Sequence, residues 1–289
     1  MQTPPVDRLS GVLERFHVRA ELHHSGALCG RNRFDADAGH GYLHVLRRGT
    51  LDVRHPGARG LPKTLRFEAP TLLLYPRPVT HVFDNPPAEG PDFTCARLMF
   101  EGGADNPLAR ALPPLIALPL ARVPGLHGAL DLLIAETGRV QCGQRLLADR
   151  LFEVVLIQLL RWLLDHPEEA GVAPGLITGL SDPRLARVLV AMHEAPGNAW
   201  TLERMAACAG MSRTAFVNCF REHVGQTPAD YLNDWRIALA KGRLRSGAPM
   251  KLLAEQLGYA TPSALSRAFK AKVGASPRAW LASAETPAA

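Results

Sequence analysis

The chain has 289 residues, of which 47% are hydrophobic, and its formal net charge is +6. This length fits two domains better than one, and the apolar fraction excludes general disorder. Residues 182–289 contain 14 Lys+Arg and 8 Asp+Glu, whereas residues 1–181 contain 19 of each kind. A neutral part joined to a basic part is typical of a protein in which one domain meets a polyanion, most often nucleic acid.

Three further classes are excluded by local composition. The first thirty residues contain acidic side chains and no apolar core, which predicts no signal peptide. The most apolar stretch, 146–164, is interrupted by charged and amide side chains, so no membrane span is expected. The five cysteines are odd in number and form no C-x-x-C pair. They argue against a disulfide scaffold or a zinc finger and favour a reducing, cytoplasmic location.

Short strand patterns fill the chain from about residue 20 to residue 100. Turns rich in Gly and Pro separate them, and no helical crossover fits between them. Short strands at roughly ten-residue spacing indicate an antiparallel sandwich or barrel rather than a parallel sheet. The predicted strands are 41–47, 50–54, 64–68, 71–75, 80–83 and 93–100.

Helical spacing begins after a proline-rich passage, 106–124. Residues 144–166 are apolar on most of the helix circumference. A helix of this kind has to be buried, either under the sheet or against a second subunit, and periodicity does not separate the two. We therefore predict a helical and dimerisation segment over 126–170, with simple core as the alternative. Residues 171–181 are predicted to be a flexible linker.

The last hundred residues are helical throughout and contain an internal repeat. The segment 220–228, with Phe-Arg and then Gly-Gln-Thr-Pro, recurs at 269–277 as Phe-Lys and then Gly-Ala-Ser-Pro, a shift of 49 residues. Upstream of the turns the shift is 48, so one extra residue lies in the second turn. A duplicated helical motif in the basic half of the chain predicts two equivalent recognition elements.

Each copy has the signals of a helix-turn-helix unit. Gly210 and Gly258 end the first helix of each copy, and Ser212 and Thr261 can cap the second. The second helix of such a unit is the one that enters a major groove. Thr227 and Pro228 begin a long connecting helix, which would hold the two major-groove helices about one helical turn of DNA apart.

Outward-facing side chains of these second helices are the candidate DNA contacts. Arg267 can hold guanine, and Asn218 can hold adenine, through paired hydrogen bonds. Cationic side chains nearer the helix ends are better placed for phosphates. The predicted base contacts are Arg213, Thr214, Val217, Asn218, Pro262, Ser263, Ser266 and Arg267. The predicted phosphate contacts are Arg221, Lys270, Lys272 and Arg278.

Residues 182–283 resemble the DNA-binding domain of AraC-type transcriptional regulators, because both units and both Gly-x-Ser/Thr-Pro signatures are present. The resemblance implies a sequence-specific transcription regulator, expected to be an activator, that is not an enzyme. Its implied partners are double-stranded operator DNA, RNA polymerase and a second copy of the chain, with no membrane contact. Val217 and Pro262 stand where the family often has polar side chains, so the first helix is expected to read its bases weakly.

In such regulators a β-rich front half is usually a cupin-like barrel that senses a signal. The implied fold class is α+β and multidomain, with an antiparallel cupin-like barrel and helices in front of an all-α domain that holds two helix-turn-helix units. The expected boundaries are 1–125 for the barrel, 126–170 for the helical segment, 171–181 for the linker, 182–283 for the DNA-binding domain and 284–289 for the tail.

The front half matches the cupin motifs only in part. Residues 76–85, with prolines at 76 and 78, His81 and Asn85, resemble the second cupin motif, but Tyr42 stands where the metal-binding glutamate of the first would be. No cofactor is therefore certain. This argues against the rival interpretation, a cupin-fold metalloenzyme fused to a DNA-targeting domain. His44 and His81 remain candidates, either as hydrogen-bonded interior histidines or as ligands of a metal ion or a small anion.

Two cysteines give a second sensor hypothesis. The placement of Cys29 and Cys95 resembles that in the reactive-chlorine-responsive activators of the AraC type, in which two front-domain cysteines oxidise. A thiolate near Arg31 or Arg97 would have a lowered pKa and react faster. The alternative is two buried, inert thiols. The identity of the signal stays open.

Overall fold

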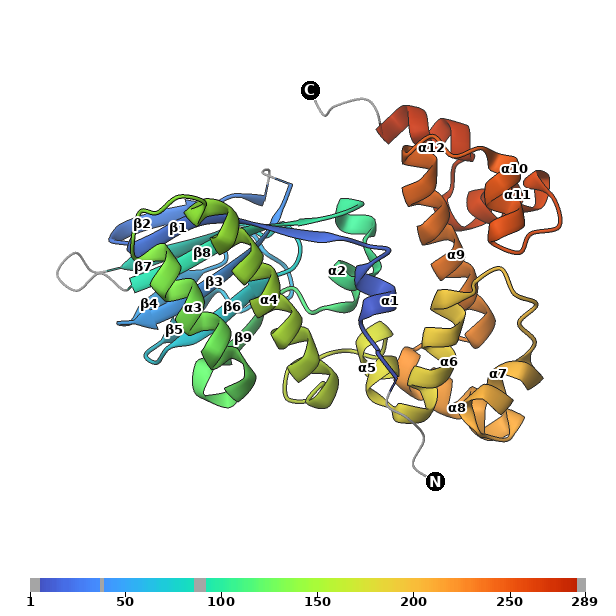
Figure 1. Ribbon diagram of the computed structural model, residues 1–289, viewed down its shortest axis with the longest axis horizontal. Coiled ribbons are helices and arrows are strands. Elements are labelled where there is room, and N and C mark those ends of the chain that lie inside the picture. Colours follow the sequence, from blue (N-terminus) through green and yellow to red (C-terminus); the bar gives the residue numbers. More distant parts are fainter. Residues whose placement is uncertain (1–5, 37–38, 86–91, 285–289) are drawn as a thin grey trace. The chain divides into compact units, whose positions relative to one another are not determined.

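The structure is a computed structural model that describes residues 6–36, 39–85 and 92–284. Its chain divides into two compact units. Residues 17–173 form the first, which we call the sheet unit. Residues 6–16 together with 174–284 form the second, which we call the helical unit. The first unit contains the strands and the second is built from helices alone (Figure 1).

The described part of the sheet unit contains two antiparallel sheets, ordered β1-β8-β3-β6-β9 and β2-β7-β4-β5. No hydrogen-bonded strand pair joins the two sheets within the described residues. The antiparallel prediction is therefore confirmed, whereas the closed barrel is replaced by a two-layered sandwich. The strands are β1 Val18–Ala27, β2 Gly30–Phe34, β3 Gly41–Arg48, β4 Leu51–Arg54, β5 Thr64–Phe67, β6 Thr71–Tyr75, β7 His81–Asn85, β8 Asp92–Phe100 and β9 Ile116–Pro119.

Strand β9 was not expected, because it lies in the proline-rich passage. It pairs with β6 at the edge of the larger sheet, where a missing backbone N–H costs least. The core between the sheets is built by alternate side chains of the strands. It contains Phe34, Tyr42, Leu46, Leu51, Val53, Leu73, Tyr75, Phe83, Phe93 and Cys95.

Helices cover one face of the larger sheet (Figure 1). They are α3 His127–Thr137 and α4 Gln144–Asp165. The unit also contains α2 Pro107–Ala111 and short 3-10 turns at Gly103–Asp105, Leu120–Arg122 and Pro124–Leu126. Phe152, Leu159 and Leu163 of α4 are fully buried, whereas Leu146 and Leu147 are exposed by 61% and 48%. The predicted apolar helix is therefore part of the core on one side and open on the other.

The helical unit contains α1 Ser10–Leu13, α5 Leu176–Ser181, α6 Pro183–Glu194, α7 Leu202–Ala209, α8 Arg213–Val224, α9 Pro228–Arg245, α10 Met250–Gln256, α11 Pro262–Val273 and α12 Pro277–Ala284. The predicted repeat thus appears as two helix-turn-helix units, α7–α8 and α10–α11, joined by α9. Among the described residues no helix combines the length and the apolar character needed to cross a bilayer.

Two predicted boundaries differ from the structure. The linker prediction is wrong for residues 176–181, because α5 is helical and buries Ile177 and Leu180 in the helical unit. Residues 6–16 were assigned to the barrel, but they belong to the helical unit. The placement of residues 176–181 and of residues 6–16 depends on long-range packing, so no local sequence pattern predicted it. The predicted tail lies outside the described residues except for Ala284.

Candidate nucleic-acid interface and histidine core

The first helix-turn-helix unit is built by two local signals. Gly210 ends α7 with a φ of 69°, a left-handed conformation that favours glycine. Ser212 then caps α8, its hydroxyl accepting a hydrogen bond from the backbone N–H of Ala215 at 3.3 Å. Phe216 and Phe220 are fully buried and fix which face of α8 points outward.

The second unit repeats this arrangement with one extra residue in its turn. Thr261 caps α11 and accepts from the N–H of Ala264 at 3.1 Å, while Leu265 and Phe269 are fully buried. At Gly258 an added Cβ would lie 2.5 Å from the carbonyl oxygen of Gly197. The turn of the second unit therefore packs against the loop between α6 and α7, where a larger residue would not fit.

The side chains predicted to meet DNA lie on the open faces of α8 and α11. Most of the predicted base contacts are exposed, and two, Val217 and Ser266, are half-buried. The exposed ones are Arg213, Thr214, Asn218, Pro262, Ser263 and Arg267. All four predicted phosphate contacts, Arg221, Lys270, Lys272 and Arg278, are exposed. The structure thus leaves the predicted contact faces open to a ligand, and the contacts themselves remain predictions.

Two of these cations already have acidic partners. Arg213 Nη1 lies 3.0 Å from a carboxylate oxygen of Glu203 on α7, and Lys272 Nζ lies 2.5 Å from Asp234 on α9. Exposed pairs of this kind contribute only about 0–1 kcal/mol, so a phosphate or a base can replace the carboxylate. The sequence offered no signal for the second pair, because the two residues are 38 positions apart.

The connecting helix α9 joins the two helix-turn-helix units within the helical unit. It has 18 residues, a length of roughly 27 Å, against about 34 Å for one turn of B-DNA. Arg236 of α9 donates to the carbonyl oxygens of Pro196 at 2.8 Å and Asn198 at 3.2 Å. Its guanidinium also lies 5.6 Å from the ring centroid of Tyr259, beside the second turn. Arg236 thus joins the first helix-turn-helix unit to the second, and the sequence alone did not predict this role.

In the sheet unit, His44 and His81 lie together as expected. Their Nε2 atoms are 2.9 Å apart, and both side chains are fully buried. His81 Nδ1 lies 2.8 Å from the carbonyl oxygen of Val79, so Nδ1 carries the proton and Nε2 is the acceptor. His44 Nε2–H must then donate to His81. The remaining His44 Nδ1 is buried and has no hydrogen-bond partner among the described residues.

Aromatic rings enclose this pair. The ring of His81 stacks between Phe34 and Tyr75, with centroid distances of 4.8 and 4.0 Å, and Tyr42 stacks on His44 at 5.3 Å. Burial lowers the pKa of His81 to about 4 and brings the pKa of His44 well below its ordinary value. Both histidines are therefore neutral at pH 7.

The pair does not fit a cupin metal centre. No group of three or more His, Cys, Asp or Glu side chains in the described part of the chain could hold a metal ion. Tyr42, in the place expected for a glutamate, contributes a stacked ring instead of a carboxylate. Protein sites for transition metals generally supply three or more ligands. The hydrogen-bonded interior histidines are the better description of these residues.

Known sequences match the chain along both units. The cupin family matches residues 7–165, and a helix-turn-helix domain matches residues 205–283. The chain belongs to the cupin family, and its helix-turn-helix domain is of the AraC type. A putative AraC-like transcription regulator of Streptomyces antibioticus is 35% identical over 181 residues, which are 62% of this chain and 59% of that protein. The chain thus spans about three fifths of the length of the first curated relatives that it matches.

Two other proteins are similar to this AraC-type chain. The RCS-specific HTH-type transcriptional activator RclR of Escherichia coli strain K12 is 28% identical over 239 residues, 81% of each chain. The crystal structure of the DNA-binding domain of AdpA in complex with a target DNA is 31% identical. It covers 36% of this chain and 96% of that one, with a TM-score of 0.33.

The cysteines of this AraC-type chain differ from the expectation in one respect. Cys95 lies in the core between the sheets, and burial raises the pKa of its thiol, although the charge of Arg47 acts in the opposite direction. The expected lowering of the pKa is therefore wrong for Cys95. Cys29 is exposed just after β1. Oxidation of these two thiols stays a prediction, and only Cys29 has the access that it requires.

Proposed function

We propose that this AraC-type protein is a sequence-specific DNA-binding transcription regulator, located in the cytoplasm, that reads two successive major-groove segments with α8 and α11. The observation that carries the proposal is the pair of capped recognition helices, each with a buried aromatic face and an open polar face. The positive balance of residues 182–289 supplies the attraction to phosphates. The relatives named above are regulators, which supports DNA control rather than catalysis.

Selection of operator sequences from random DNA by the full chain tests this proposal. Competition in gel-shift titrations should then show that unrelated DNA displaces the selected site only at an excess of about 1000-fold or more. An architectural DNA binder would show little preference between the two competitors. Such a result would leave the fold intact but would contradict a role in reading particular promoters.

The sheet unit is the natural place for the sensing function. We infer that a signal acts on it and changes the fraction of molecules whose helical unit is competent for DNA or for RNA polymerase. The buried pair His44 and His81 and the exposed thiol of Cys29 support this inference, because a purely structural domain does not require such groups.

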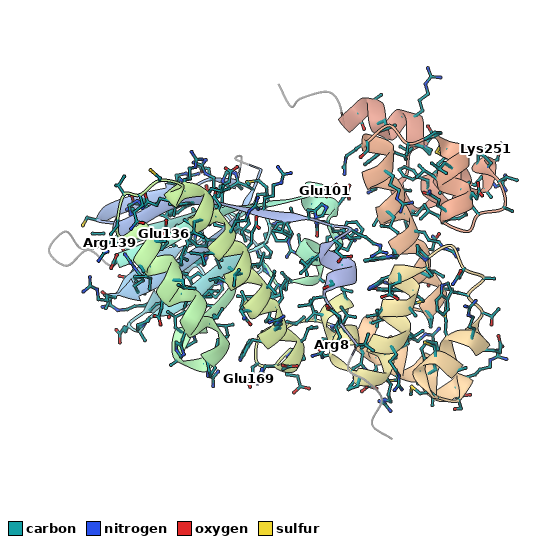
Figure 2. All side chains as sticks on the ribbon, viewed as in Figure 1. Arg8, Glu101, Glu136, Arg139, Glu169 and Lys251 are labelled. Atoms are coloured by element: carbon teal, nitrogen blue, oxygen red, sulfur yellow. The ribbon has the colours of Figure 1, made fainter. Side chains whose placement is uncertain are left out.

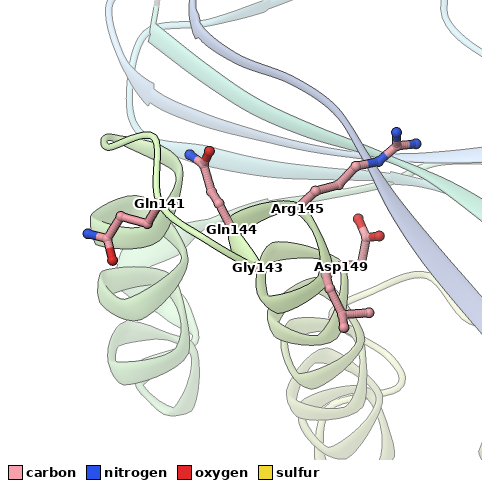
Figure 3. A pocket seen from close by; sticks show the side chains of 6 residues that line it. Gln141, Gly143, Gln144, Arg145 and Asp149 are labelled. Atoms are coloured by element: carbon pink, nitrogen blue, oxygen red, sulfur yellow. The ribbon is translucent and has the colours of Figure 1, made fainter.

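The open side of α3 and α4 supports a homodimer. Leu132, Leu146 and Leu147 are exposed by 62%, 61% and 48%. A groove of about 400 Å³ runs beside them, and Glu136 and Arg139 at the end of α3 supply charges of both signs (Figure 2). A second hollow of about 560 Å³ lies at the start of α4, where Gln144 and Arg145 project beside Asp149 (Figure 3). An apolar surface flanked by both charges suits pairing with its own copy across a two-fold axis.

Replacing Leu147 by glutamate is expected to convert a dimer of the full chain into a monomer, because the symmetric interface would bury two carboxylates. Sedimentation velocity at several protein concentrations measures this change. Leu252→Glu is the matched control, since Leu252 is also a leucine on an exposed helix face, 43% exposed, but it belongs to α10 of the helical unit. A Leu147→Glu variant with the sedimentation coefficient of the parent would exclude α4 from the interface.

A further inference from the structure

We propose that residues 6–16 are a fixed part of the DNA-binding body and pack on the core beneath the first recognition helix, so that the sheet unit is joined to that body at both of its ends. The chain crosses between the two units at residues 16–17 and again at 173–174. A regulator with a single linker would pass a signal through one connection. In this chain the first connection runs directly from Phe16 into strand β1.

The segment is held by burial rather than by surface contacts. Leu9, Val12 and Phe16 are 7%, 1% and 6% exposed, although α1 itself has only four residues. Such a short helix has no stability of its own, so its conformation depends on the surface that it covers. That surface is α6, with which α1 is in contact within the helical unit. The three apolar side chains therefore belong to the core of the helical unit.

Two arginines of the segment reinforce this attachment. Arg8 donates to the carbonyl oxygen of Leu180 near the end of α5 at 3.3 Å, and Arg15 donates to that of Glu194, the last residue of α6, at 3.5 Å. Carbonyl groups at helix C-termini lack partners within their own helix and carry partial negative charge. The segment thus contributes cations at two helix ends of the DNA-binding body; Arg8 is labelled in Figure 2.

Phe16 connects to the recognition helix through a continuous series of rings. The series crosses from the N-terminal segment to α9, to α6, back to α9 and on to the buried face of α8. His193 is central to it, because its Nε2 is 2.6 Å from the hydroxyl of Tyr231. The distances between successive ring centroids are 5.1 Å for Phe16–Trp235, 3.8 Å for Trp235–His193, 5.8 Å for His193–Tyr231, 5.8 Å for Tyr231–Phe220 and 5.5 Å for Phe220–Phe216.

On the other side of the crossing, β1 is firmly held in the sheet unit. The N–H of Leu22 donates to Asp149 Oδ1 of α4 at 2.6 Å, and the carbonyl oxygen of His17 accepts from the N–H of Glu101 at 2.8 Å. Only His17 separates this anchored strand from Phe16. The first connection between the sheet unit and the helical unit is therefore a single residue long.

Hydrogen exchange of the full chain tests the proposal without any DNA. Phe16→Ala should lower amide protection in α6, α8 and α9 by about 100-fold, while β3, β6 and β8 keep the parental protection. His17→Ala is the matched control, because His17 is the exposed neighbour, and it should leave all of these segments unchanged. Unaltered protection in the three helices, or an equal loss in the strands, would overturn the proposal.

A milder variant separates packing from general misfolding. Phe16→Leu keeps an apolar side chain at this position and should restore most of the protection lost in Phe16→Ala. In the same variants, affinity for the selected operator should follow the protection of α8. This last readout rests on the proposed function, whereas the exchange pattern does not. Absence of specific DNA binding would therefore refute the proposed function, while the exchange pattern would still test whether residues 6–16 belong to the core of the helical unit. If Phe16→Leu lost as much protection as Phe16→Ala, the proposed packing of Phe16 would be wrong.

Discussion

Replacing Arg267 by alanine is expected to weaken binding to the selected operator by roughly 5- to 150-fold, or ~1–3 kcal/mol, and to relax the preference at one base position. Arg267 is exposed on the outward face of α11, whose opposite face is fixed by the buried Leu265 and Phe269. A guanidinium on that face can form two parallel hydrogen bonds with the edge of a guanine. Fluorescence anisotropy with the operator and its single-base variants measures both effects.

Lys272→Ala provides the contrasting variant on the same helix. Lys272 is predicted to contact a phosphate, and its present partner is Asp234. Its loss should weaken binding to all sequences alike and reduce the salt dependence by about one unit of slope. If Arg267→Ala also weakened binding to every sequence equally, Arg267 would be a phosphate contact and its assignment to a base would be wrong.

Acidification is expected to destabilise both units strongly, because each contains a histidine that is buried in its neutral form. Burial lowers the pKa of His81 from 6.5 to about 4 and that of His193 from 6.5 to about 3. The unfolded chain therefore binds more protons than the folded chain in this range, so stability is complete above pH 6.5 and falls as the pH decreases toward the folded values. At pH 5 the loss is about 2 kcal/mol for each histidine.

Urea unfolding at pH 7 and pH 5, followed by hydrogen exchange in each unit, measures this loss. His193→Gln keeps a polar partner for the hydroxyl of Tyr231 and removes the titrating group. It should flatten the pH dependence of the helical unit while that of the sheet unit stays unchanged. The exposed His127 provides the control as His127→Gln. A helical unit that loses as much stability at pH 5 in His193→Gln as in the parent would contradict the role of His193.

The parts of the fold that local chemistry determines were predictable. Ser212, Thr227 and Thr261 cap helices, and glycines end them, so the two helix-turn-helix units could be placed almost to the residue. The alternating strands were placed for the same reason. Strands β1, β2 and β9 were not among the predicted strands, and helices α1 and α5 were missed, because each depends on distant partners for its place in the fold.

The candidate sites divide in the same way. The meeting of His44 and His81 was expected, because both lie on strands that face the same interior. The lowered pKa expected for Cys95 was wrong, because that expectation considered a nearby arginine and could not see how completely the thiol is buried. Arg236 and Phe16 could not have been found from the sequence, since their partners, in the loop after α6 and on α9 respectively, are brought near only by the fold.

The claim that α8 and α11 both bind the major groove of one operator is tested most directly by inserting five base pairs between the two halves of that operator. Because α9 fixes α8 and α11 in one body, the two helices have to meet grooves on the same side of the duplex. An insertion of about half a helical turn rotates one half-site to the opposite side. The account predicts that affinity falls to the level of unrelated DNA, and that inserting a full turn does not restore it. Undiminished binding to the operator with the five-base-pair insertion would contradict the claim that both helices read DNA together.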